Sequence, residues 1–244
     1  CVLATVVSGS TILGADDGLP ETIPADAKVR KIAGDCRFTE GPVWHAASGR
    51  LLFSDIPNNR VVELTFKADG TTAAKDFLKP SGRSNGLVFD RSGTLWACQH
   101  ADRRVVKVDM STKKMTVVAD TFDGKKLNSP NDIALDAAGG AYFTDPRYGP
   151  ADNLEQSVMG VYYVDASRKV SRISESFTKP NGILVSLDGK TLYVADQPKG
   201  EVHAFPITAP GKIGKGKLIF KGDKKLDGSG PDGMALDERG NVYA

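Results

Sequence analysis

The chain has 244 residues, of which 40% are hydrophobic and 25% charged, so it has enough apolar side chains for a sizeable core and is not globally disordered. Its 32 Lys and Arg nearly balance its 30 Asp and Glu, which gives no sign of a nucleic-acid-binding surface. The 26 glycines and 13 prolines are scattered between short apolar runs, a pattern typical of one all-β domain with many strands and tight turns.

The N-terminal residues are small and apolar, and the first charged side chain is Asp16. They resemble the end of a secretory signal with its cleavage zone, so we predict a leader over residues 1–26 and a periplasmic or secreted protein. An N-terminal strand is the alternative, and a lipid-anchored form through Cys1 is a third interpretation. Elsewhere no run of about twenty apolar residues exists, so no integral membrane segment is expected.

The cysteines and histidines are too far apart in the chain to form a short metal-binding spacing or a dense disulfide pattern. Cys98 lies within a strand pattern and is expected to be a small buried side chain. A disulfide between Cys36 and Cys98 is left open. Cysteine usage therefore does not determine the cellular compartment.

One sequence pattern recurs five times, over residues 39–55, 84–98, 130–145, 179–196 and 231–244. Each copy has a polar residue followed by Gly or Asp, then an apolar strand, a tight turn and a second strand. Further strands with alternating polarity are expected between the copies, at residues 60–64, 104–109, 160–164 and 201–205. The large aromatic side chains of these strands are expected in the core, namely Trp44, Phe53, Trp96, Phe143 and Tyr193.

The leading polar residues stand at positions 40, 85, 131, 181 and 232, so successive copies lie 45 to 51 residues apart. A period of this length with about four short strands predicts β-propeller blades. A propeller closes when its last blade meets its first, and six blades would need about 50 to 60 more residues. We therefore predict an all-β, six-bladed propeller of four-stranded blades over residues 27–244, truncated within blade five, with the sixth blade missing.

Each polar residue of the repeat has two interpretations. Taken singly, an Asn-Gly or Asp-Gly pair predicts a tight turn. However, Glu40 is not a favoured turn residue and has the same register, and the inner strands of a propeller converge on its axis. We therefore expect five side chains to point their oxygens into one small space: Glu40, Asn85, Asn131, Asn181 and Asp232.

Such a cluster requires a partner, because converging carboxylates and buried polar groups are costly when unpaired. A hard divalent cation binds carboxylate and amide oxygens without His or Cys, so we predict Ca²⁺. Mg²⁺ and Mn²⁺ are alternatives because they also accept oxygen ligands, and Zn²⁺ is a poorer match for this set. A different acidic series, Asp55, Asp145 and Asp196, recurs at strand ends and is expected to cap turns.

Five motifs occur in order along the chain: Glu-Gly-Pro-Val-Trp at 40–44, Asn-Ser-Pro-Asn-Asp at 128–132, Phe-Thr-Asp-Pro-Arg-Tyr-Gly at 143–149, Lys-Pro-Asn-Gly-Ile at 179–183 and Gly-Pro-Asp-Gly-Met at 230–234. Together they resemble the gluconolactonase/regucalcin (senescence marker protein, luciferin-regenerating-enzyme-like) family of six-bladed propellers. The resemblance covers about residues 30–244. Ser-Asn-Gly-Leu at 84–87 and Ala-Cys-Gln-His at 97–100 are similar to the bacterial gluconolactonase-like branch.

The resemblance implies a metal site made by four residues, Glu40, Asn131, Asn181 and Asp232. It also implies that Asp232 is the general base of lactone hydrolysis, although a base that ligates the metal is weakened. Asn85 is expected to contact the substrate or a bound water. His100, Asp145 and Tyr148 are further candidates for substrate contact, with structural hydrogen bonding or solvation as their alternative roles.

The activity that follows is metal-dependent hydrolysis of a sugar lactone such as an aldonolactone. The cation would polarise the carbonyl and Asp232 would activate water. The expected partner is therefore a small lactone or ester, and nothing indicates an oligomeric state. The alternative function is a non-catalytic propeller that binds a ligand or partner around a structural calcium, because a fold alone does not imply a function.

Overall fold

The computed structural model describes residues 6–8, 11–13, 28–149, 152–222 and 230–244. Antiparallel strands dominate these ranges, and the helical segments are two short 3₁₀ turns, η1 (Ala46–Ser48) and η2 (Gln197–Lys199). Among the described residues, no helix has the length and apolar character needed to span a membrane. The prediction of an all-β chain is therefore confirmed.

Three consecutive segments of the chain form four-stranded sheets in which sequence neighbours pair. The first sheet contains β3 (Thr39–His45), β4 (Arg50–Asp55), β5 (Arg60–Phe66) and β6 (Thr72–Leu78). The second contains β7 (Ser84–Phe89), β8 (Leu95–Gln99), β9 (Arg104–Val108) and β10 (Met115–Ala119). The third contains β13 (Ile133–Leu135), β14 (Ala141–Asp145), β15 (Gly160–Val164) and β16 (Val170–Ser174).

The fourth sheet extends the same pattern, and a short ribbon lies apart from it. The sheet contains β17 (Pro180–Val185), β18 (Thr191–Asp196), β19 (Glu201–Ala209), β20 (Lys212–Ile213) and β21 (Lys217–Lys221). The ribbon pairs β11 (Thr121–Phe122) with β12 (Lys125–Lys126). All four strands predicted between the repeat copies are present, as β5, β9, β15 and β19.

The fifth sheet joins the two ends of the described chain. Strand β22 (Ala235–Leu236) pairs with β23 (Val242–Tyr243), and β23 pairs with β1 (Val6–Ser8), which pairs with β2 (Thr11–Leu13). Two short strands therefore fall within residues 1–26, and the leader over this range stays a prediction. The other residues of 1–26 lie outside the described ranges.

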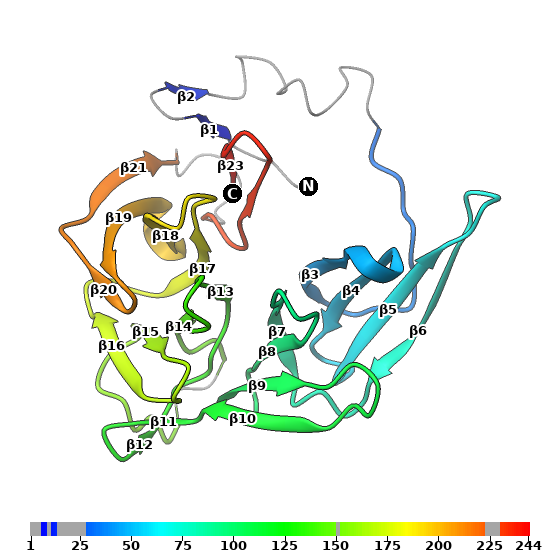
Figure 1. Cartoon of the computed structure of the whole chain (residues 1–244), viewed down its shortest axis with the longest axis horizontal. Coiled ribbons are helices and arrows are strands. Elements are labelled where there is room, and N and C mark those ends of the chain that lie inside the picture. The colour runs from blue at the N-terminus through cyan, green and yellow to red at the C-terminus, as the bar shows by residue number, and fades with distance from the viewer. Residues whose placement is uncertain (1–5, 9–10, 14–27, 150–151, 223–229) are drawn as a thin grey trace.

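The sheets surround a common centre, as blades do in a β-propeller (Figure 1). Strands β3, β7, β13 and β17 lie nearest that centre and later strands of each sheet lie further out. Apolar clusters fill the spaces between neighbouring sheets. For example, Leu52 packs with Leu95 between the first and second sheets, and Trp96 packs with Phe143 between the second and third. The second and third sheets thus have apolar clusters against both of their faces.

The Asn-Gly pairs lie inside strands, which excludes the tight-turn alternative for these two copies of the repeat. Asn85-Gly86 is part of β7 and Asn181-Gly182 is part of β17, and neither glycine has a positive φ. In β3, β7 and β17 alike, the register shifts by one residue at this position. Such β-bulges redirect a side chain within a sheet, so the repeat encodes a bulged strand start.

Of the five aromatic residues predicted for the core, three are buried, Tyr193 is half-buried and Trp44 is exposed. Phe53, Trp96 and Phe143 are buried. Trp44 is 51% exposed and packs against Phe66 on the surface of the first sheet, with ring centroids 5.9 Å apart. The prediction for Trp44 is therefore wrong. Its strand alternates along its length, and Trp44 falls on the outward side of β3.

The aspartates at the ends of the second strands cap backbone groups, as predicted. Asp145 accepts the main-chain N–H groups of Asn128 and Ser129, both at 2.7 Å, and Asp196 accepts those of Thr178 and Lys179 at 2.9 and 3.0 Å. In each case the capped residues lead into the inner strand of the same sheet, β13 or β17. The caps therefore hold the segments that carry the polar residues of the repeat.

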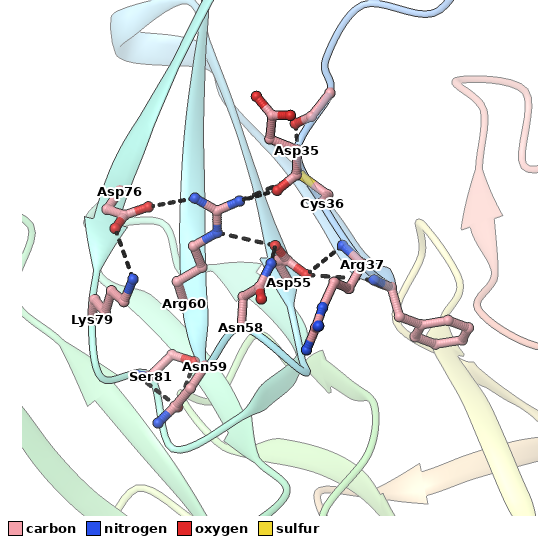
Figure 2. Close-up of polar contacts among 12 residues, drawn as sticks. Asp35, Cys36, Arg37, Asp55, Asn58, Asn59, Arg60, Asp76, Lys79 and Ser81 are labelled. Atoms are coloured by element: carbon pink, nitrogen blue, oxygen red, sulfur yellow. Dashed lines mark hydrogen bonds and ion pairs between the residues drawn. The ribbon is translucent and has the colours of Figure 1, made fainter.

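Asp55 has the same role in the first sheet (Figure 2). Its Oδ1 accepts the main-chain N–H groups of Arg37 and Phe38, and its Oδ2 accepts Nε of Arg60 at 3.0 Å. Arg60 also bonds Asp76 at 2.9 Å. Asp55 is wholly buried, so this network fixes the start of β3.

Candidate functional site

The polar residues of the five repeat copies lie at equivalent places at the start of the inner strands. Glu40, Asn85 and Asn181 occupy the bulged starts of β3, β7 and β17. Asn131 and Asp232 lie just before β13 and β22. The bulge and the capped segment before it bring these residues to the same end of their sheets.

The main-chain oxygens of these residues are held by the preceding sheet. The oxygen of Asn85 accepts Oγ of Ser54 at 2.8 Å, and the oxygen of Asn181 accepts Oγ1 of Thr144 at 2.7 Å. The oxygen of Asn131 accepts the N–H of Gly86 at 2.7 Å. Each sheet thus contacts the next through its backbone, and this fixes the positions from which the side chains project.

Two of the asparagine side chains are nearly buried and have no hydrogen-bond partner among the described residues. Asn85 is 8% exposed and Asn131 is 4% exposed. Within the described part of the chain, neither side-chain amide makes a hydrogen bond. Buried amides normally have a partner in native proteins, so these two are available to a bound ion, water or substrate.

Three carboxyl groups from different sheets are close enough to influence one another. Burial, followed by the charges of Asp232 and Asp132, raises the pKa of Glu40 to about 7. Burial and Asp232 raise the pKa of Asp132 to about 6. Burial raises the pKa of Asp232 as well, against hydrogen bonds that lower it. The site therefore concentrates negative charge in a poorly solvated place.

Asn181 and Asp232 are joined by a chain of hydrogen bonds. Nδ2 of Asn181 donates to the hydroxyl of Tyr148 at 2.9 Å, and this hydroxyl donates to Oε1 of Gln197 at 2.7 Å. Nε2 of Gln197 donates to Oδ2 of Asp232 at 3.1 Å. Burial and the charge of Asp232 raise the pKa of Tyr148 well above its usual value, so the phenol stays protonated and can donate.

His100 and Asp145, the other predicted substrate contacts, have different surroundings. Both carboxylate oxygens of Asp145 are used by backbone N–H groups, and the residue is wholly buried. The ring of His100 bonds the main chain of Tyr148, and burial lowers its pKa. Its Nδ1 is buried without a partner in the described residues. The structure brings Tyr148 to the cluster, whereas Asp145 lies beneath it.

Two residues of the cluster were missed by the sequence reasoning. Asp132 stands where other copies of the repeat have glycine, and its carboxylate accepts the N–H groups of Ile133 at 2.9 Å and Ile183 at 3.0 Å. That departure from the repeat was a usable signal. Gln197 gave no such signal, because it lies in a connecting turn after β18 and joins the cluster through tertiary contacts.

The donor set fits a hard cation better than a soft one. Within the described ranges, no group of three or more His, Cys, Asp and Glu side chains could hold a metal ion. The cluster instead combines carboxylates with amides, as Ca²⁺ sites do. A bound divalent cation would offset the repulsion between the carboxylates and give the unpartnered amides a ligand.

Cys36 and Cys98 are free thiols and do not form a disulfide.

Comparisons with known proteins agree with this architecture. A sequence profile described as the SMP-30/gluconolactonase/LRE-like region matches residues 38–244. The chain belongs to this family. It is 31% identical to a gluconolactonase from Zymomonas mobilis, and the match covers 93% of this chain and 69% of that protein. The resemblance stated from the motifs is therefore confirmed.

Solved structures of the SMP-30/gluconolactonase/LRE-like family have the same fold. A gluconolactonase from Xanthomonas campestris superposes with a TM-score of 0.74 at 28% identity, covering 85% of this chain and 69% of that one. A calcium-binding protein, regucalcin, from Agrobacterium tumefaciens superposes with a TM-score of 0.66 at 22% identity. The superposition covers 85% of this chain and 66% of the regucalcin chain. At this identity the match supports the fold alone.

Proposed function

We propose that the chain is a divalent-metal-dependent lactonase that opens a sugar lactone such as an aldonolactone. Similarity to gluconolactonases supports lactone hydrolysis as the reaction class. The observation that carries the metal dependence is the equivalent position of Glu40, Asn131, Asn181 and Asp232 at the starts of the inner strands, where burial and the charge of Asp232 raise the pKa of Glu40. We propose Ca²⁺ as the cation, held by Glu40, Asn131, Asn181 and Asp232.

The residues around the proposed cation would divide the chemistry among them. When bound, the cation supplies Lewis-acid polarisation of a carbonyl. The amide of Asn85 is nearly buried and unpartnered in the described residues, so it suits a hydrogen bond to a substrate oxygen. The carboxylate of Asp232, whose Oδ2 accepts Nε2 of Gln197, would accept a proton from the attacking water.

The test is hydrolysis of a panel of aldonolactones by the purified chain, with and without a chelator. We expect hydrolysis that chelation abolishes and Ca²⁺ restores. Asp232→Asn keeps an oxygen ligand but removes the base, and we expect it to lower kcat by at least about 100-fold. A chain that binds Ca²⁺ but opens no lactone or ester would instead be a binding propeller with a structural ion. Full activity in Asp232→Asn would exclude Asp232 as the base.

Other features remain proposals from the sequence. We propose a six-bladed propeller, to which the described sheets contribute five blades. We also propose a periplasmic or secreted location, which protease accessibility in intact and osmotically shocked cells would test.

The substrate contact proposed for His100 is tested by His100→Ala, which should raise KM with little change in the melting temperature.

A further inference from the structure

We infer that Gln197 and Tyr148 are positioning residues that set which atoms of Asn181 and Asp232 face the cation. The inference rests on the proposed function, because it assigns a role toward the proposed metal site. It arises from the hydrogen-bond chain that runs from Asn181 through Tyr148 and Gln197 to Asp232. Each member of this chain has one permitted direction of donation.

The direction of donation is set at the acidic end of the chain. An ionised carboxylate can only accept hydrogen bonds, so Gln197 must present its NH₂ group to Asp232. Its Oε1 then faces Tyr148, whose single hydroxyl proton must point toward it. The lone pair of the Tyr148 hydroxyl can then only accept a hydrogen bond. Nδ2 of Asn181 donates this hydrogen bond.

The consequence is a fixed amide orientation at Asn181. Because Nδ2 is committed to Tyr148, Oδ1 is the amide atom left for the cation, and a hard cation binds oxygen. A reversed amide would present N–H groups to a positive ion. The carboxylate of Asp232 accepts Nε2 of Gln197 at Oδ2, and it also accepts a hydrogen bond from the Asn181 side chain, which turns the same amide N–H group away from the cation. Partners that orient metal ligands in this way are a recurring feature of metal sites.

The backbone around Gln197 is built for this contact. Gln197 begins η2 directly after Asp196, whose carboxylate caps the segment that leads into β17. A Cβ on Gly230 would overlap the main-chain oxygen of Gln197, so these two segments touch through their backbones. Gln197 and Asp232 are thus held together independently of their side chains.

Tyr148 is fixed from its other face. Nζ of Lys179 lies 4.7 Å from the centre of the Tyr148 ring, which is a cation–π distance. The main-chain N–H of Lys179 is bonded to Asp196 at 3.0 Å. Asp196 therefore supports both middle members of the hydrogen-bond chain, because it precedes Gln197 in sequence and holds the residue that packs on Tyr148.

The test is calorimetric titration of Ca²⁺ into chelator-treated protein for the wild type, Gln197→Met, Tyr148→Phe and the double variant. Met matches the volume of Gln without its hydrogen bonds, and Phe removes only the hydroxyl. We expect each single variant to weaken Ca²⁺ binding about 10- to 100-fold. The double variant should be no weaker than the worse single variant, because one break already disrupts the chain.

Gln156→Met is the matched control. Nε2 of Gln156 bonds the main-chain oxygens of Phe122, Lys125 and Lys126, so this glutamine has a purely structural role away from the cluster. We expect it to lower the melting temperature and leave Ca²⁺ affinity unchanged. Melting of each metal-free protein, recorded in parallel, separates a loss of positioning from a loss of folding.

The outcomes discriminate between the two proposals. Wild-type affinity in both single variants, or multiplied losses in the double variant, would overturn the positioning role. If Gln197→Met does not fold, Tyr148→Phe decides alone. A wild type that binds Ca²⁺ without opening a lactone would remove the proposed reaction and leave the titration valid. A wild type that binds no Ca²⁺ would remove the metal site and the positioning role together.

Discussion

A Cβ atom on Gly41 would overlap the main-chain oxygen of Asn85 in the neighbouring sheet. The same relationship joins Gly182 to the oxygen of Asp232. In these copies of the repeat, and at Gly86 beside the main-chain oxygen of Asn131, the glycine that follows the polar residue is therefore required where the backbones of two sheets touch. The polar residue and the glycine act together: the glycine lets neighbouring sheets approach closely, and this approach places successive polar residues side by side.

Gly182→Ala should destabilise the chain, because its Cβ would meet backbone that cannot move independently of the next sheet. We expect a loss of about 2 kcal/mol or more in the free energy of unfolding, and a melting temperature lower by about 4 to 8 °C. Gly34→Ala is the control, since its Cβ would contact only the end of the Lys31 side chain, at 3.8 Å. Equal melting temperatures for the two variants would contradict the close contact.

Glu40→Gln should weaken Ca²⁺ binding, because it removes one of the charges that converge on the site. For the wild type, Ca²⁺ at 100 times its Kd should stabilise the fold by about 2.7 kcal/mol. We expect most of this shift to disappear in Glu40→Gln at the same concentration, measured by thermal melting with and without Ca²⁺. Glu63→Gln alters a buried ion pair on β5 instead, and should keep the full shift.

Asp55→Asn should make the free energy of unfolding depend less on pH in the acidic range. Burial alone would raise the pKa of Asp55, but hydrogen bonds from Asn58, the Arg37 main chain and Arg60 hold it below its usual value. A carboxyl group with a lowered pKa stabilises the fold above its unfolded pKa of about 4, and this contribution is lost as the pH falls through the folded value.

The measurement for Asp55 is urea unfolding at pH 7 and at successively lower pH. Asp55→Asn should be less stable than the wild type at pH 7, and the difference should shrink below about pH 4. The control is Asp123→Asn. Asp123 is exposed, and asparagine tolerates its positive φ of 53°, so the free energy of unfolding of this variant should match that of the wild type at every pH. A difference for Asp55→Asn that is constant with pH would contradict the prediction.

The repeat explains why so much of the fold could be predicted from the sequence. Strand alternation and the 45 to 51 residue period locate β5, β9, β15 and β19 and align the polar residues, because each sheet is specified locally. The same alignment groups Glu40 with Asp232, although they lie far apart in the chain.

Long-range contacts explain what could not be predicted. The pairing of β1 with β23 joins distant parts of the chain, and no local pattern specifies it. Gln197 enters the site through hydrogen bonds that depend on where three sheets meet. The Asn-Gly pairs also suit a tight turn because turn propensity is local, whereas their glycines are required by the neighbouring sheet. Asp132 was missed because it breaks the repeat at the site itself.

The most direct test of the metal site is anomalous diffraction from crystals grown with Ca²⁺. The account predicts an anomalous peak surrounded by oxygens of Glu40, Asn131, Asn181 and Asp232 at about 2.3 to 2.6 Å. Asn181 should bind the cation through Oδ1, while its Nδ2 stays hydrogen-bonded to Tyr148. Strong Ca²⁺ binding at another set of residues, or no peak at this cluster under saturating Ca²⁺, would contradict the account.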